Sequence, residues 1–251
     1  MKSSAKGSWV FPVVLLVTAG AGAFAASGTG PPGVWVFLVV LGGWVISLCL
    51  HEFAHAAVAL AFGDTSVRAR GYLTLNPVRY ADAGTTVVLP LLLLAIGGIP
   101  LPGGAVRLEP HRMRHPAAAS MVALAGPATN LVLGVVAATV SAELAGMGGD
   151  LRVLAAALSF LAVLQFVTAV LNLVPVPGFD GFGAVEPTLP TRVRARIAPI
   201  RPWAPLVVVA LLFSVPALSR ALFDVGEWAL RQAGGSTALA AAGSALFRFW
   251  T

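Results

Sequence analysis

The stretch that decides the fold is residues 34–62, VWVFLVVLGGWVISLCLHEFAHAAVALAF. Its residues before His51 include no charged side chain, and about 20 apolar residues suffice for a helix to cross a bilayer. Ionisable side chains then occur together as His51, Glu52 and His55. The stretch therefore predicts a membrane-spanning helix that carries a polar group toward its C-terminal end.

The composition of the whole chain also indicates a membrane protein. The 251 residues are 58% hydrophobic and 10% charged, whereas soluble domains are about 45–50% apolar and about 25% charged. Five or six spans would use this length, so one membrane-embedded domain over residues 1–251 is predicted. The net charge of +6 is better explained by basic cytoplasmic loops than by nucleic-acid binding. With Cys49 as its lone cysteine, the chain has no intrachain disulfide and no cysteine metal cluster.

Apolar runs and basic loops together predict the topology. Spans are expected at residues 9–26, 34–62, 117–140, 151–174 and 202–219, followed by an amphipathic tail or weak last span at 220–251. The first run also resembles a signal peptide, although we favour an uncleaved span. Arginines after the 34–62 span and at residues 192–201 place these loops in the cytoplasm. Residues 85–99 are short and interrupted by Pro90, so a re-entrant segment is preferred to a full crossing.

The pentapeptide HEFAH, residues 51–55, carries the strongest chemical signal. His51 and His55 are four residues apart, so both imidazoles project from one face of a helix. In the H-E-x-x-H pattern the two histidines bind zinc and the glutamate, here Glu52, acts as general base. Ionisable groups inside a membrane are costly and are usually functional, which disfavours the alternative of a polar patch that only pairs helices.

A third zinc ligand is required, because catalytic zinc keeps three protein ligands and one open position. Asp180 is the best candidate, since it lies in PVPGFDG, residues 175–181. Irregular backbone of this kind is tolerated at membrane depth only where it is buried in protein or lines a cavity. His51 lies about 26 Å from the outer end of its span at 1.5 Å per residue. Asp180 follows the inner end of the 151–174 span, so the two residues have similar depth.

Four motifs occur in order along the chain. They are His51-Glu52-x-x-His55, Asn76-Pro77 with Asp82-x-Gly84-Thr85, Ala125-Gly126-Pro127-x-x-Asn130, and Asn172-Leu173-x-Pro175-x-Pro177-x-x-Asp180-Gly181. Together they resemble the site-2 protease family of intramembrane zinc metalloproteases, peptidase family M50, in its minimal bacterial form without a PDZ or CBS domain. The resemblance covers roughly residues 48–181, within an expected core at 34–182. It implies an all-α polytopic membrane protein with five or six transmembrane helices, a re-entrant segment and a small membrane-embedded β-hairpin at residues 102–110.

The resemblance also implies roles for individual residues. One zinc ion would be held by His51, His55 and Asp180, with Glu52 activating water and Asn172 assisting catalysis beside it. The residues expected to contact substrate are Ala105 and Val106 of the hairpin, and Asn130, for which helix packing near the site is the other interpretation. The implied partners are membrane proteins, single-pass ones such as anti-sigma factors or signal-peptide remnants, and the lipid bilayer. The implied location is the plasma membrane of a bacterium, as a multi-pass protein that binds no nucleic acid.

Alternatives remain open at this point. A metal transporter or metal-binding membrane protein would need several ligand sets along a path, and the other spans contain almost no histidine, aspartate or glutamate. A catalytically inactive relative is disfavoured by the intact Glu52, and a CAAX-processing type of membrane zincin by Asp180-Gly181. Other titratable residues that we weighed as ligands are Glu109, Glu186, His111 and His115. Arginines surround the last two and disfavour a divalent cation there.

Overall fold

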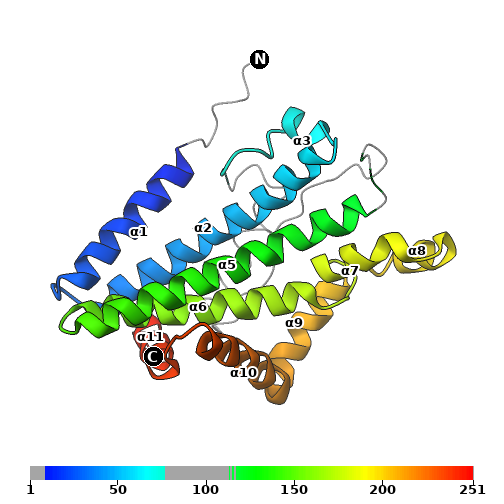
Figure 1. Ribbon diagram of the computed structural model, residues 1–251. Helices are drawn as coiled ribbons and strands as arrows, with labels where there is room; N and C mark the ends of the chain where they lie inside the picture. Colours follow the sequence, from blue (N-terminus) through cyan, green and yellow to red (C-terminus); the bar gives the residue numbers. More distant parts are fainter. Residues whose placement is uncertain (1–8, 77–112, 114, 116, 251) are drawn as a thin grey trace.

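The computed structural model describes residues 9–76, 113, 115 and 117–250 (Figure 1). Three long helices run side by side: α2 (Pro32–Ala61), α5 (Ala118–Met147) and α6 (Leu151–Leu173). Each is long and apolar enough to cross a membrane. In the most apolar 18-residue stretch of each helix, 78% of α6 is buried inside the protein, compared with 50% of α2 and 39% of α5. Helix α6 is therefore the central helix, against which the others pack.

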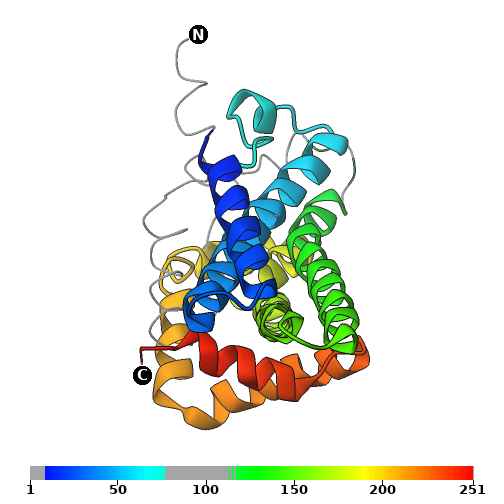
Figure 2. The same ribbon diagram turned by 90° about the vertical axis from the view of Figure 1, so that its left-hand side faces the viewer.

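Shorter helices surround this core. Helix α1 (Val10–Ala26) packs along α2. Helices α10 (Pro216–Gln232) and α11 (Thr237–Phe247) pack against α6 and cross one side of the bundle (Figure 2). The remaining elements are α3 (Ser66–Ala69), α7 (Asp180–Val185), the 3-10 helix η4 (Glu186–Thr188), α8 (Thr191–Ile197) and α9 (Ala204–Ser214).

The order of the long helices brings two distant motifs to one end of the bundle. Helices α5 and α6 are antiparallel, because Gly148 and Gly149 form a tight turn between them with φ of 74° and 61°. Helix α2 also runs antiparallel to α5 (Figure 1). The C-terminal end of α2, the N-terminal end of α5 and the C-terminal end of α6 therefore lie together. HEFAH on α2 and Asp180, which begins α7 after α6, share this end.

The predicted fold class is wrong in its count of five or six spans, and the described residues contain no strand of the predicted β-hairpin, although their all-helical character fits. Within the described residues there is no strand, and three helices can span a membrane, or four if the bent pair α9 and α10 counts as one span. Helix α1 has 17 residues, about 26 Å, which is shorter than the roughly 30 Å hydrocarbon core. The chain bends by 96° between α9 and α10, where Pro216 cannot continue a helix because it lacks an N–H. The predicted re-entrant segment at 85–99 and hairpin at 102–110 lie outside the described residues.

Candidate metal centre

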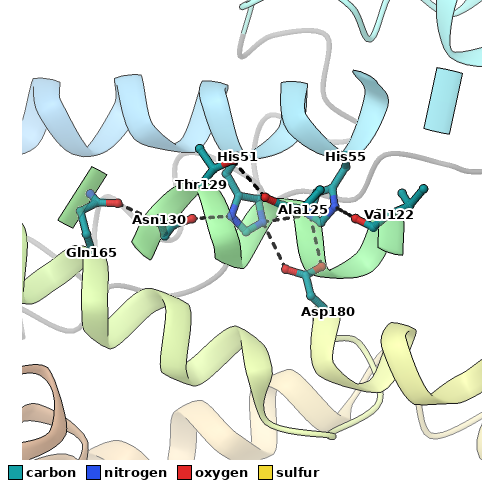
Figure 3. Close-up of polar contacts among 8 residues, drawn as sticks. All are labelled: His51, His55, Val122, Ala125, Thr129, Asn130, Gln165 and Asp180. Atoms are coloured by element: carbon teal, nitrogen blue, oxygen red, sulfur yellow. Dashed lines mark hydrogen bonds and ion pairs between the residues drawn. The ribbon is translucent and has the colours of Figure 1, made fainter. Parts of the chain in front are cut away.

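His51 and His55 point from one face of α2 toward α5 (Figure 3). Both are buried, with 5% and 6% of their surface exposed. Their Nε2 atoms lie 3.0 Å apart. The four-residue spacing thus brings one imidazole nitrogen of each histidine close to the other, as the sequence predicted.

Asp180 reaches the same point from the start of α7. Its Oδ2 lies 3.2 Å from Nε2 of His51, and its Oδ1 lies 3.4 Å from Nε2 of His55. Two glycines make this position accessible: Gly178 has a φ of 100°, and a Cβ at Gly181 would collide with the backbone carbonyl of Leu173. The irregular stretch after α6 therefore turns the chain back so that α7 packs directly on the end of α6.

The donor set fits a divalent cation. Nδ1 of His55 lies 2.6 Å from the carbonyl oxygen of Val122, and Nδ1 of His51 lies 2.5 Å from Oδ1 of Asn130. A carbonyl oxygen only accepts hydrogen bonds, so Nδ1 of His55 carries a proton, and in the neutral imidazole Nε2 then carries a lone pair. With His51 in the same state, two lone pairs and a carboxylate converge, and their ligand atoms all lie within 4.8 Å of one another. Three acceptors that face one another repel each other unless a proton or a metal cation lies between them.

Asp180 is suited to act as a carboxylate. Burial raises the pKa of its carboxyl, but protonated imidazoles of His51 and His55 beside it lower that pKa below its ordinary value. A metal cation held by the three side chains would favour the carboxylate in the same way, and the carboxylate is the form that binds a metal. Two imidazoles and one carboxylate form a three-ligand set of the kind found in catalytic zinc sites.

Helix α5 covers the two histidines closely. Val122, Gly126 and Asn130 follow one another at intervals of four residues, so they lie along one face of α5. A Cβ at Gly126 would come closer than 3.0 Å to Nε2 of both His51 and His55. Only glycine at this position allows α5 to pack at this distance without displacing the imidazoles.

Comparisons with known proteins give the chain its family. The family model of Peptidase family M50 matches residues 36–150. A protein of Mycolicibacterium smegmatis named "Putative zinc metalloprotease Rip2" is 44% identical, and the match covers 100% of this chain and 97% of the relative. The chain belongs to peptidase family M50.

Further relatives of this M50 peptidase agree. A Mycobacterium tuberculosis protein with the same name is 42% identical over 100% of this chain and 96% of the relative. A Bacillus subtilis protein named "Putative zinc metalloprotease YwhC" is 30% identical over 72% of this chain and 82% of the relative. No solved structure matches. The predicted site-2 protease family and the predicted enzyme class, a zinc metalloprotease, are confirmed, and the ligand set and the relatives' names agree with the predicted zinc cofactor.

The structure describes three of the other residues predicted for the site of the M50 peptidase. Glu52 is 2% exposed and lies beside His51 on α2, and Asn172 is 3% exposed near the C-terminal end of α6. Asn130 is buried, with Oδ1 against His51 and its amide nitrogen donating to Gln165. Its side chain is thus engaged by protein groups on both sides. Ala105 and Val106 lie outside the described residues.

Two of the alternative ligands lie away from the donor set. His115 is exposed, and its Nδ1 accepts a hydrogen bond from the backbone N–H of Ala117 at 3.1 Å. Glu186 forms an ion pair with Arg201 at 3.0 Å. Glu109 and His111 lie outside the described residues. Among the described residues, the group that could hold a metal ion therefore consists of His51, His55 and Asp180.

Three contacts of the site were not predicted from the sequence. Val122 contributes a backbone carbonyl, which any residue type could supply, so its side chain gives no signal. Gly126 was quoted within a motif without a role of its own. Gln165 gave a usable signal, because it is an amide within an apolar span and polar groups there are costly unless they have a partner.

Proposed function

We propose that this M50 peptidase hydrolyses peptide bonds of transmembrane proteins at a zinc site within the membrane, near the cytoplasmic face. The observation that supports this most directly is the convergence of His51, His55 and Asp180 beside the buried carboxyl of Glu52. These histidines belong to α2, which is apolar and long enough to span a bilayer. Metal ligands and a general base inside such a helix are suited to substrates that are themselves in the membrane.

The depth of the site follows from its place along α2. His51 follows Pro32 by 19 residues and precedes Ala61 by 10 residues, or about 29 Å and about 15 Å at 1.5 Å per residue. The site is therefore nearer to the C-terminal end of α2. The exposed Arg68 and Arg70 follow this end, and basic loops are typical of the cytoplasmic side. We infer a plasma-membrane protein of a bacterium with this end in the cytoplasm.

The proposed reaction gives each residue one task. His51, His55 and Asp180 would hold a zinc ion, which would supply Lewis acidity that lowers the pKa of water to about 7 and polarises a carbonyl. The carboxylate of Glu52 takes the proton of the attacking water and gives it to the leaving amine. The side-chain amide of Asn172 donates a hydrogen bond to the oxygen on which negative charge develops.

A transmembrane helix must unwind locally before it can be cleaved, because its carbonyls are used in i→i−4 hydrogen bonds. Ala105 and Val106 are proposed to pair with the extended substrate segment. The proposed substrates are single-pass membrane proteins, with anti-sigma factors and signal-peptide remnants as two classes to examine first.

The test compares membranes of cells that contain either the active enzyme or its Glu52→Gln variant. We expect single-pass proteins to accumulate uncut in the variant, while purified variant protein keeps its zinc. The cut sites, mapped from the new termini in the active strain, should lie within apolar segments. Identical proteomes would contradict the proposal, as would cut sites confined to soluble domains.

A further inference from the structure

A line of buried polar side chains connects His51 with the middle of the bundle. From Asn130, Nδ2 donates to Oε1 of Gln165 at 2.8 Å, and from Gln165, Nε2 donates to Oγ of Ser47 at 2.7 Å. The hydroxyl of Ser47 donates to the backbone carbonyls of Gly43 and Trp44 at 3.0 and 2.9 Å. All four residues of this line are buried, with between 1% and 5% of their surface exposed: His51, Asn130, Gln165 and Ser47. The line crosses from α5 to α6 and returns to α2, and Figure 3 shows its part from His51 to Gln165.

The direction of every hydrogen bond in this line is determined from its far end. Backbone carbonyls only accept, so the hydroxyl of Ser47 must donate to them and its oxygen is left to accept. The amide of Gln165 must then turn its nitrogen to Ser47 and its oxygen to Asn130. Asn130 in turn must give its nitrogen to Gln165 and its oxygen to His51.

The consequence at the metal centre is a defined tautomer. Oδ1 of Asn130 accepts, so Nδ1 of His51 must carry a proton, and in the neutral, metal-binding imidazole Nε2 keeps the lone pair that faces Asp180. His55 obtains the same state directly from the carbonyl of Val122. His51 therefore depends on side chains of two other helices for the state that His55 receives from the backbone. If the amide of Asn130 turned over, it would instead favour a His51 tautomer protonated at Nε2, which cannot bind a metal there.

We propose that Gln165 is a positioning residue, which fixes the amide of Asn130 and through it the Nδ1-protonated tautomer of His51, and thereby raises the zinc affinity of the site. This inference rests on the proposed role of His51 as a zinc ligand. Partners that orient a metal-ligating histidine typically contribute 10–100-fold to metal affinity. Gln165 contacts Asn130 and not His51 itself, so its contribution to zinc affinity should be near the lower end of that range.

The experiment uses two variants of the full chain, purified in detergent. Gln165→Met keeps the length of the side chain but removes its hydrogen bonds, whereas Gln165→Glu keeps an acceptor oxygen toward Asn130 whether or not it is ionised. A matched control is Thr168→Val on the same helix, because Thr168 is buried and its hydroxyl donates to the backbone carbonyl of Leu164 one turn earlier in that helix.

Two quantities are measured for each protein. Zinc affinity is determined by competition with a chelator, and the His51 tautomer by ¹⁵N NMR of zinc-free protein labelled at its four histidines. We expect Gln165→Met to lower zinc affinity about tenfold and to show a mixture of His51 tautomers. Gln165→Glu and Thr168→Val should keep the wild-type affinity and the single Nδ1-protonated form.

Several results would overturn the inference. Unchanged affinity and an unchanged tautomer in Gln165→Met would do so, and so would equal losses in Gln165→Met and Gln165→Glu, which would indicate a packing effect. If Gln165→Met does not fold, Ser47→Ala provides the same readout, because it removes the group that orients Gln165 and should also mix the tautomers. Absence of zinc from the wild-type protein would refute the proposed function, while the NMR measurement would still decide the role of Gln165.

Discussion

Replacing Gly126 with alanine tests how closely α5 approaches the two metal-facing histidines. The added Cβ would lie within 3.0 Å of Nε2 of both His51 and His55, whereas ordinary van der Waals contact begins at 3.4 Å. The imidazoles and α5 must then separate by at least about 0.4 Å, the difference between these two distances. This is at least twice the roughly 0.2 Å within which metal–ligand distances are normally held. Both histidines are affected at once, so zinc affinity should fall by at least the roughly 10–100-fold that loss of an outer partner causes.

The stability of the helix itself should not suffer from this change, because alanine is a better helix former than glycine by about 1 kcal/mol. Gly146→Ala on the same helix is the matched control, since a Cβ there meets nothing within 4 Å. Zinc content and affinity of the detergent-purified proteins are measured by elemental analysis and chelator competition, with thermal unfolding as a check of folding. Gly146→Ala should match the wild type. A folded Gly126→Ala protein with wild-type zinc affinity would show that α5 does not pack against the histidines in this way.

The remaining predictions concern the ligand, the base and the turn before α7. Asp180→Ala should lose most of its bound zinc, because two histidines alone form an incomplete site; undiminished zinc in elemental analysis would remove Asp180 from the ligand set. Glu52→Gln should keep its zinc but cleave a membrane substrate in liposomes about 10²–10⁴-fold more slowly, the usual contribution of general acid–base catalysis; unimpaired cleavage would exclude Glu52 as the base. Gly181→Ala should lower both zinc affinity and thermal stability, because its Cβ would meet the backbone of Leu173, which cannot rotate away as a side chain can. Gly20→Ala on α1, where a Cβ meets nothing within 4 Å, is the control for Gly181→Ala, and equal behaviour of the two variants would contradict this account.

The parts of the fold that depend on local sequence were predictable. The apolar runs at 34–62, 117–140 and 151–174 correspond to α2, α5 and α6, with α5 extending further to Met147. A long apolar run with helical spacing requires only neighbouring residues to be recognised. The same holds for His51 and His55, whose proximity follows from their spacing. The prediction that Asp180 joins them required only that the inner ends of two spans have the same depth.

The parts that failed depend on where helices end and on what they meet. The span expected at 202–219 was drawn through Pro216, yet the chain bends there and a separate amphipathic helix, α10, begins. Pro216 is a local signal for that break, but hydropathy alone does not detect it. Val122 had no such signal, and the polarity of Gln165 indicates only that it needs a partner. Both contacts depend on the register between helices that are distant in sequence. The roles of Ala105, Val106 and Asn172 stay predictions.

The register between α2 and α5 explains why two of the four motifs belong together. His51 and His55 are separated by four residues, and so are Gly126 and Asn130. On the antiparallel helices His55 contacts Val122 and His51 contacts Asn130, eight residues apart on α5, and Gly126, midway between these two, lies opposite both Nε2 atoms. A shift of α5 by one residue would rotate its contact face by about 100°. It would bring a side chain against the imidazoles in place of Gly126 and would remove the acceptor from His51. The two motifs thus meet at the histidines, where Gly126 leaves room for both imidazoles and Asn130 supplies the acceptor for His51.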